Sequence, residues 1–587
     1  MVRERPVTNI VRTTGIVLAW ATLCWAGNQS VPQALEPELP TLHCLGFRWL
    51  IAGDDNGNAV VSARYRQAGE GDWRPAMPLF RVESAAMQER KPPEGVTMHA
   101  GSIFNLTPDT AYEVELELRD PDGGGGTRQL ALRTWKEPEA PAPKRTLHVQ
   151  PPAEEAANPA PAAGTGSEGD PFRGIAAADA SAQPGDLMLL HAGVYPGPVS
   201  FTKSGSEEAP VVWRAAGDGE VVIEGPEGGR AVSASRLKHV IFEGLTIRNA
   251  GGGMNLTNSA SVTVRRCRFL RVHSGIQADG QQERLFISDN VFEGLCRWQE
   301  RAPGEDRAIE LSGVGHVVAY NRISGFKDGV DTRPDYPVRA IDIHNNDISE
   351  CVDDGIELDF SEQNTRAYQN RLTNCAMGIS FQPARGGPAY AVRNVLYNIG
   401  LESFKLHLTP PGPGRMTSGG VILHNTVVKT GVPVRVWSNE GPAHRYYLRN
   451  NLLVGGQGPY AIELTCPIEE SDWDYDAYVG GPFAKFARWN GQSYASLDEF
   501  RAATQEEKHG LLLPWSDDLF ASGVAGPKDL AEQYPVSVND LRLGPRSPAI
   551  DRGVALPSVN DGYRAEAPDL GAIEEGDPLP HYGPRTK

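Results

Sequence analysis

Three acidic residues occupy matching positions in successive segments in the middle of the chain, at Glu310, Asp331 and Glu357. Each is third in a five-residue segment whose second residue is apolar, as in GIELD at 355–359. Alternate side chains of a β-strand point to opposite faces, so we expect the apolar residues to point inward and the acidic ones outward. Carboxylates about 5 Å apart repel each other unless a cation, a raised pKa or abundant water compensates. Together with Asp359, this group predicts an all-oxygen site suited to Ca²⁺.

Basic and aromatic residues stand at the equivalent positions of neighbouring segments. Lys405 is a candidate base for removing a proton from a substrate, and Arg435 or Arg333 is a candidate clamp for a substrate carboxylate. An exposed aromatic side chain such as Trp437 can stack on a sugar ring. The candidates are Lys405, His407, Arg435 and Arg333 for catalysis, Trp437, Gln382 and Arg385 for substrate binding, and Glu310, Asp331, Glu357 and Asp359 for metal binding. The alternative interpretation is a solvated sheet face whose opposite charges pair by chance.

A repeat of roughly 24 residues positions these segments. Asparagine recurs before an aliphatic residue, and a period of this length with short strands indicates a solenoid of stacked coils. The asparagines are expected to form an internal ladder in which each amide bonds to the next coil. The ladder is predicted to contain Asn290, Asn321, Asn346, Asn370, Asn394, Asn425 and Asn450, with Cys267 in the equivalent place one coil earlier.

Two further features depend on this period. Cys351 and Cys375 lie one period apart and should occupy adjacent coils, either as a disulfide or as two buried thiols. Insertions at 295–305 and 409–418 lengthen the repeat beside the acidic and basic segments. Long loops on a rigid scaffold often carry function, so we expect these two to form the walls of a groove.

The segment that enters the repeat resembles a known family. DPFRGI at 170–175 leads through a short amphipathic stretch to Ala182, and QPGDLMLLHAGVY follows at 183–195. This segment resembles the capped entrance of pectate-lyase-like, right-handed parallel β-helix proteins. A cap has a physical reason, because an uncovered end of a stacked sheet promotes aggregation. The predicted fold class is all-β, a right-handed parallel β-helix solenoid preceded by a small β-sandwich.

The sandwich is predicted from short alternating segments that precede the repeat. The segment LTPDTAY, which ends at Tyr112, resembles the tyrosine corner of fibronectin type III domains. A Pro/Ala-rich linker follows, and the asparagine period ends before the C-terminus. The expected division is a signal peptide at 1–26, a fibronectin type III-like sandwich at 37–136, a linker at 137–170, the β-helix at 171–467 and a C-terminal cap at 468–587.

The N-terminus and the charge balance narrow the class of protein. Three arginines precede a 13-residue apolar run, which is too short to span a bilayer and is typical of an export signal. We therefore expect a secreted protein, extracellular or periplasmic, with no membrane span after signal removal. The formal net charge of −18 disfavours a nucleic-acid partner. We also expect the protein to be a monomer.

The resemblance to pectate-lyase-like proteins implies activity on polysaccharides, and three functions fit the residues. The favoured one is a lyase that cleaves a uronate-containing glycan by β-elimination, with Ca²⁺ and with Lys405 as base. Burial near Arg435 is expected to lower the pKa of Lys405 toward neutrality. The second is a glycoside hydrolase that uses a carboxylate pair, such as Asp331 with Glu357, or Glu357 with Asp359. The third is a surface protein that binds an acidic polysaccharide without cleaving it.

Overall fold

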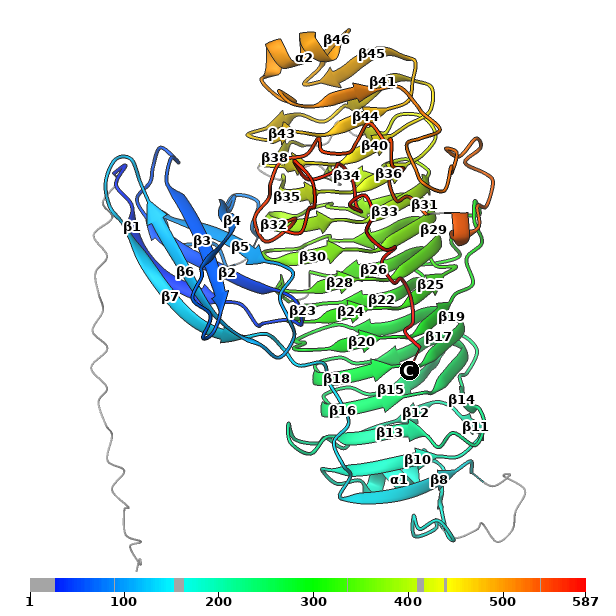
Figure 1. Ribbon diagram of the computed structural model, residues 1–587. Helices are drawn as coiled ribbons and strands as arrows, with labels where there is room; N and C mark the ends of the chain where they lie inside the picture. Colours follow the sequence, from blue (N-terminus) through cyan, green and yellow to red (C-terminus); the bar gives the residue numbers. More distant parts are fainter. Residues whose placement is uncertain are drawn as a thin grey trace, which may run out of the picture.

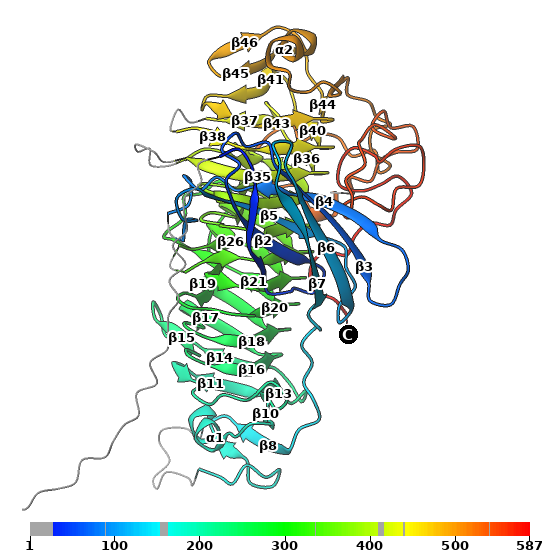
Figure 2. The same ribbon diagram turned by 90° about the vertical axis from the view of Figure 1, so that its left-hand side faces the viewer.

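The structure, a computed structural model, describes residues 27–586 apart from 89, 153–162, 335, 409–415, 438–440 and 539. The expected export signal and most of the 409–418 insertion lie outside the described residues. Strands dominate, and the α-helices of this part of the chain are α1 (Ile175–Ser181) and α2 (Leu497–Thr504). None of its helices is long and apolar enough to cross a bilayer. Figures 1 and 2 show a tall stack of strands with an antiparallel domain against its side, which confirms the predicted fold class.

The N-terminal module is an antiparallel β-structure whose strands follow the order β1-β2-β5-β4-β3-β6-β7. Its strands are β1 (Val31–Pro37), β2 (Leu45–Ala52), β3 (Val60–Gln67), β4 (Arg74–Arg81), β5 (Val96–Ile103), β6 (Ala111–Arg119) and β7 (Gly125–Arg133). Alternate residues of β6 are buried, which places Val114 and Leu116 in the module core. The hydroxyl of Tyr112 accepts a hydrogen bond from the backbone N–H of Thr107 at 2.9 Å.

Two long parallel sheets form the β-helix. The first contains β8 (Arg145–Gln150), β9 (Phe172–Arg173), β10 (Asp186–Leu190), β13 (Val211–Ala215), β16 (Lys238–Glu243), β18 (Ala260–Arg265), β20 (Phe286–Ser288), β24 (Val317–Ala319), β28 (Asp342–His344), β30 (Thr365–Tyr368), β32 (Arg385–Val392), β35 (Thr417–Leu423), β38 (Ala443–His444), β39 (Tyr447–Arg449), β42 (Ile468–Glu469) and β43 (Asp472–Asp474). Its outer face is the one on which the N-terminal module lies, with β5 beside β32 (Figure 1).

The second sheet carries the candidate site. It contains β11 (Gly193–Pro196), β12 (Val199–Ser200), β14 (Val221–Glu224), β15 (Arg230–Ser233), β17 (Thr246–Asn255), β19 (Arg268–Ala278), β21 (Val291–Glu293), β22 (Arg307–Leu311), β25 (Arg322–Ser324), β26 (Asp328–Thr332), β29 (Asp347–Glu357), β31 (Arg371–Ser380), β33 (Val395–Ile399), β34 (Phe404–Lys405), β36 (Thr426–Val428), β40 (Leu452–Val454), β44 (Ala477–Val479) and β47 (Leu511–Leu513). Smaller sheets join β23 (Gly313–Val314) to β27 (Val338–Arg339), and β37 (Val434–Val436), β41 (Gly458–Leu464), β45 (Phe483–Trp489) and β46 (Gln492–Tyr494) to one another.

The β-helix is longer at both ends than the sequence indicates. Residues 145–150, placed in the linker above, form β8 and pair in parallel with β10, and Val149 lies in the helix core. At the other end, stacked strands continue past 467 to β47. The asparagine repeat in the sequence ends before the β-helix does, because the coil after Asn451 carries Asp476 at the ladder position.

The asparagine ladder is confirmed, with one correction. Each side-chain amide donates to the side-chain oxygen on the next coil, for example Asn346 Nδ2 to Asn370 Oδ1 at 3.0 Å. The ladder member after Asn425 is Asn451 rather than Asn450, because Asn451 Oδ1 accepts from Asn425 Nδ2 at 3.0 Å. Asn450 instead donates to the backbone carbonyl of Val554 at 2.8 Å. Asn450 and Asn451 are adjacent in the sequence, so the repeat alone could not show which of them belongs to the ladder.

Cys351 and Cys375 are neighbours in register on β29 and β31, as the period predicts. Both are buried free thiols. The short helix α1 covers the first coils, and its Ile175 and Ala178 pack into the same core as Val149. The β-helix interior is therefore apolar and closed at its N-terminal end.

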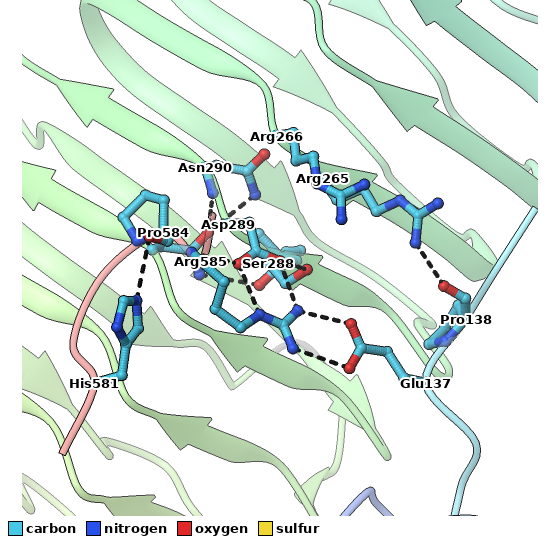
Figure 3. Close-up of polar contacts among 12 residues, drawn as sticks. Glu137, Pro138, Arg265, Arg266, Ser288, Asp289, Asn290, His581, Pro584 and Arg585 are labelled. Carbon is cyan, nitrogen blue, oxygen red and sulfur yellow. Dashed lines mark hydrogen bonds and ion pairs between the residues drawn. The ribbon is translucent and has the colours of Figure 1, made fainter. Parts of the chain in front are cut away.

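The chain after residue 544 runs back along the coils toward the N-terminal half of the β-helix (Figure 1). Near its end, Arg585 forms ion pairs with Asp289 of the β-helix and with Glu137 of the linker, each at 2.7 Å (Figure 3). Higher up, Leu556 packs in a cluster with Phe104 of the module and Tyr390 of β32. Module, β-helix and C-terminal segment therefore share packed contacts.

Candidate functional site

The predicted column of polar residues is present on the second sheet. Strand pairing puts Glu310 beside Asp331 and Asp331 beside Glu357 on successive coils. Glu357 is then followed by Ser380 and Lys405. The residues immediately before them in sequence, such as Ile309 and Val330, lie in the β-helix core. The register predicted from the repeat is therefore correct across these coils.

The side chains of this column are less exposed than an outward face suggests. Asp331 is fully buried, and Glu357, Asp359 and Lys405 are each at most 9% exposed. The charges are closely paired, since Arg307 Nε lies 2.6 Å from Asp331 Oδ2 and Lys405 Nζ lies 2.7 Å from Asp354 Oδ2. The site is therefore a packed network of opposite charges.

A group of three carboxylates forms the centre of this network. Asp328, Asp354 and Glu357 each offer an oxygen, and these oxygens lie within 4.8 Å of one another. Asp328 begins β26, and the other two lie near the end of β29 on the next coil. The register of β29 shifts between Cys351 and Asp354, so Asp354 begins the short run of β29 that also carries Glu357.

The electrostatics of this carboxylate group suit a divalent cation. Asp328 Oδ2 and Asp354 Oδ1 are buried and accept no hydrogen bond within the described residues. Burial and the charge of Asp354 hold the pKa of Asp328 well above its ordinary value. Burial, Asp331 and Asp328 do the same to the pKa of Glu357. Unsatisfied, crowded carboxylate oxygens are the donor set that Ca²⁺ prefers, so these residues fit the expected ion.

The other expected metal ligands have different partners. Glu310 Oε2 lies 3.5 Å from Arg307, which also binds Asp331. Asp359 Oδ1 accepts hydrogen bonds from the Ser380 hydroxyl at 2.6 Å and from the backbone N–H of Gln382 at 2.7 Å. Burial raises the pKa of Asp359 to about 7. Of the four expected ligands, the structure places Glu357 alone in the group of three carboxylates, and sequence reasoning did not assign Asp328 or Asp354 as ligands.

Lys405 is close to the carboxylates, and its charge state differs from the prediction. Burial favours the neutral amine, but the charges of Asp354, Asp359 and Asp353 outweigh it and raise the pKa of Lys405. The predicted lowering of this pKa is therefore wrong for the protein without a bound cation. The cause is the 2.7 Å ion pair with Asp354, which the sequence did not reveal.

A second set of predicted residues lies beyond Lys405. Glu402 is buried, its Oε2 lies 3.2 Å from His407 Nδ1, and its Oε1 accepts from the backbone N–H of Trp437 at 2.8 Å. Arg435 stacks over the Trp437 ring at 3.8 Å and pairs with Glu463 at 3.5 Å. Trp437 is 64% exposed, so one aromatic face remains available to a ligand. Glu402, which orders this end of the site, was missed because its segment shows no recognisable pattern.

The third set lies on the side facing the N-terminal module. Arg333 pairs with Asp331 at 3.4 Å, and the ring of Phe360 lies 6.0 Å from its guanidinium. Arg385 stacks on the same ring at 4.8 Å and is buried. Gln382 is half-buried, and its backbone binds Asp359. Arg333, Arg385 and Gln382 thus flank the carboxylate group, while Arg435 and Trp437 lie on β37 and just after it.

An open cavity adjoins the carboxylate group. Its volume is about 600 Å³, and it is lined by residues 301–305, Lys327, Val352 and Asp353. Lys327 Nζ lies 2.8 Å from Glu305 and 3.7 Å from Asp328, so it connects the cavity wall to the carboxylates. Residues 301–305 of the insertion at 295–305 therefore line a cavity beside the site, and a groove with 409–418 as its second wall stays a prediction.

The comparisons with known proteins give distant matches. No family model matches the chain. Pectate lyase L of Dickeya dadantii (strain 3937) is 22% identical over 434 residues, which cover 68% of this chain and 85% of that protein. The crystal structure of pectate lyase Pel9A is 18% identical with a TM-score of 0.39, and the match covers 74% of this chain and 97% of that one. The structure of XylC with xylose is 12% identical with a TM-score of 0.45, and the match covers 73% and 99%.

Proposed function

We propose that this protein is a polysaccharide lyase that cleaves a uronate-containing glycan by β-elimination. The observation that carries the proposal is the pairing of Lys405 with a carboxylate group that fits a divalent cation, beside an open cavity. The match to pectate lyase L, over 85% of the length of that protein, supports the same class. The pectate-lyase-like β-helix is consistent with it.

The roles of the residues follow from what elimination requires. A Ca²⁺ ion held by Asp328, Asp354 and Glu357 would supply positive charge opposite a uronate carboxylate and acidify the neighbouring C–H. Lys405 would then remove that proton, for which its amine must be neutral. The electron pair of the broken C–H bond would form the new C=C bond as the glycosidic C–O bond breaks and its oxygen leaves with the released part of the glycan. Because Asp354 stabilises the protonated form of Lys405, the amine becomes a base when the charge of Asp354 is engaged elsewhere.

The remaining predicted residues bind and orient the glycan in this proposal. Arg333 and Arg435 offer guanidinium donors to carboxylates of neighbouring sugar units. Trp437, with an exposed ring, supplies a stacking surface. His407 is held by Glu402 and follows Lys405 by two residues in the sequence.

A glycoside hydrolase is the second candidate, and one observation favours it. Burial and neighbouring carboxylates raise the pKa of Glu357, which suits a general acid. Asp331 is its neighbour in register on the adjacent coil and could act as the second carboxylate. A protein that binds acidic glycans without cleaving them would use the same cavity and the same charged residues.

Replacing Lys405 separates these functions. We expect Lys405→Ala to lower turnover of an acidic polysaccharide such as polygalacturonate at least about 1,000-fold, because the base is lost. The measurement is ultraviolet absorbance of the unsaturated product, with reducing ends counted in parallel. Lys203→Ala, an exposed lysine on an early coil, is the matched control. Near-normal elimination by Lys405→Ala would reject the role of Lys405, and reducing ends without absorbance would establish hydrolysis instead.

We further propose that the protein acts outside the cytoplasm as a monomer, with residues 1–26 as its export signal and the fibronectin type III-like module as a fixed part of it. The basic and apolar pattern of those first residues supports export. Fractionation of cells that express the full chain, with mass measurement of the mature N-terminus, tests this localisation.

A further inference from the structure

We propose that the N-terminal module is part of the substrate site. Its loop at residues 82–88 holds Arg385, and Arg385 positions Arg333 through the ring of Phe360. This inference rests on the proposed function, because it assigns Arg333 to the glycan carboxylate. Gln88, Arg385 and Phe360 are positioning residues in it and do not themselves touch the reacting atoms.

The first step is the close fit between the module loop and the turn that opens β32. The backbone N–H of Glu83 donates to the carbonyl of Gly386 at 3.3 Å. Gly386 has a φ of 93°, and a Cβ there would lie 2.8 Å from Val82 Cγ1 and 2.9 Å from the Glu83 carbonyl oxygen. A side chain at this position would push the loop away, so glycine permits a backbone contact between module and β-helix.

Charges fix the same loop to the coils on both sides of this contact. The carboxylate of Glu83 lies 3.4 Å from Arg445 and 3.8 Å from His444. Arg90, just beyond the loop, lies 3.8 Å from Glu362. Figure 1 places β4 and β5, the strands on either side of the loop, next to the β-helix at the level of β32. The loop is therefore held at a fixed place beside the candidate site.

The second step joins the loop to Arg385. A guanidinium N–H of Arg385 donates to Gln88 Oε1 at 2.8 Å. Arg385 is 7% exposed, and its guanidinium lies 4.8 Å from the centre of the Phe360 ring. A guanidinium has five N–H donors, and the module supplies an acceptor for one of those of Arg385. The module therefore contributes to the fixed orientation of Arg385.

The third step leads from Phe360 to Arg333. The Arg333 guanidinium lies 6.0 Å from the same ring and 3.4 Å from Asp331. The side chain of Arg333 is 32% exposed, so it reaches the surface where a glycan would lie. Phe360 is fixed by its backbone N–H, which donates to the Pro383 carbonyl at 2.7 Å. Its ring thus connects a module-bound arginine to an arginine beside the carboxylate network.

This arrangement predicts a specific kinetic effect of changing the module. Loss of the Gln88 acceptor should let Arg385 and the Phe360 ring move, so that Arg333 presents its donors less well to a glycan carboxylate. That contact is made in the bound substrate and in the transition state alike, so its loss weakens binding without slowing the chemical step. The expected signature is a raised KM with an unchanged kcat.

The test compares four variants of the full-length protein on polygalacturonate with Ca²⁺. Gln88→Ala and Phe360→Leu should each raise KM about three- to tenfold and change kcat less than about twofold, the effect of losing one such contact. Gln88→Glu keeps an acceptor for Arg385 and should restore the wild-type KM. Arg119→Ala, which removes an exposed module residue paired with Glu117, is the control.

A second measurement does not depend on turnover. Amide hydrogen exchange of residues 331–333 in protein treated with a chelator should be faster in Gln88→Ala than in wild type. Unchanged KM and unchanged exchange in both Gln88→Ala and Phe360→Leu would overturn the inference. If the wild type cleaves no acidic polysaccharide, the proposed function fails, and the role of Arg333 in glycan binding fails with it. Faster exchange would then still establish the contact path from Gln88 to Arg333.

Discussion

Asp354 is the residue on which the chemistry of the candidate site depends. Its Oδ2 lies 2.7 Å from Lys405 Nζ, and its carboxylate is also within 4.8 Å of those of Asp328 and Glu357. A cation and a lysine would therefore compete for the same negative charge. This competition makes the protonation of Lys405 dependent on whether the carboxylates hold an ion.

The carboxylate group should affect stability in two ways, through repulsion among its charges and through stabilisation by bound Ca²⁺. Removing one of its charges should separate these two effects. We expect Asp328→Asn to raise the unfolding temperature of chelator-treated protein by about 2 to 5 °C, because crowded buried carboxylates repel one another. The same change should remove most of the stabilisation that Ca²⁺ gives to wild type, since ligand binding to the folded state stabilises it. Thermal unfolding with and without Ca²⁺ measures both effects.

The control for this experiment is Asp517→Asn, which changes an exposed aspartate in the C-terminal segment. It should leave both the unfolding temperature and the response to Ca²⁺ unchanged. An Asp328→Asn protein that Ca²⁺ stabilises as strongly as wild type would show that the ion, if bound, lies elsewhere.

At the scale of elements, the end of the asparagine ladder differs chemically from its middle. Asp476 Oδ1 accepts from Asn451 Nδ2 at 2.8 Å, and the buried carboxylate of Glu507 lies close to it. Burial raises the pKa of Asp476 to about 7 and, together with Asp476, raises the pKa of Glu507. Two buried carboxylates in contact favour a shared proton.

A pH dependence of stability follows from the sign of this shift. A carboxyl whose pKa is raised by folding binds its proton more tightly in the folded state, so it costs stability as the pH rises from about 4 to about 7. Asp476→Asn keeps the oxygen acceptor and removes the titration of this carboxyl. We therefore expect the free energy of unfolding of wild type to fall between pH 5 and pH 8 by about 2–3 kcal/mol more than that of Asp476→Asn.

Urea unfolding at several pH values checks this expectation. Asn425→Asp, the reverse change in the middle of the ladder, is the matched variant and should lose stability over the same pH range. Parallel stability curves for Asp476→Asn and wild type would contradict the assignment of the proton to this carboxyl pair.

The repeat allowed the β-helix, its register and the column from Glu310 to Lys405 to be predicted from sequence. Strand alternation and a constant period fix which residues share a column, and both can be read in the chain. The place of Asp354 could not be predicted, because it depends on an irregularity in β29. The raised pKa of Lys405 was missed for the same reason. The contact of the module with Arg385 joins residues about 300 positions apart, and no local pattern reports it.

At the scale of the whole molecule, Arg585 joins three parts of the chain. Its guanidinium pairs with Asp289 of the β-helix and Glu137 of the linker. We expect Arg585→Ala to lower the free energy of unfolding by about 1–2 kcal/mol, because buried Asp289 loses its charged partner. Urea unfolding followed by tryptophan fluorescence measures the loss. Arg546→Ala, which removes an exposed pair with Asp518, should have no effect, and equal midpoints for Arg585→Ala and wild type would contradict the prediction.

The returning C-terminal segment also affects how the coils come apart. A solenoid whose coils contact only their neighbours can unfold from either end, one coil after another. Here the segment binds Asn450, Asn345 and Asp289, which belong to coils far apart along the stack. A coil in the middle cannot unfold alone while both of its flanking coils are bound to this C-terminal segment. The segment should therefore detach before the coils unfold, and the β-helix should unfold in one cooperative transition instead of coil by coil.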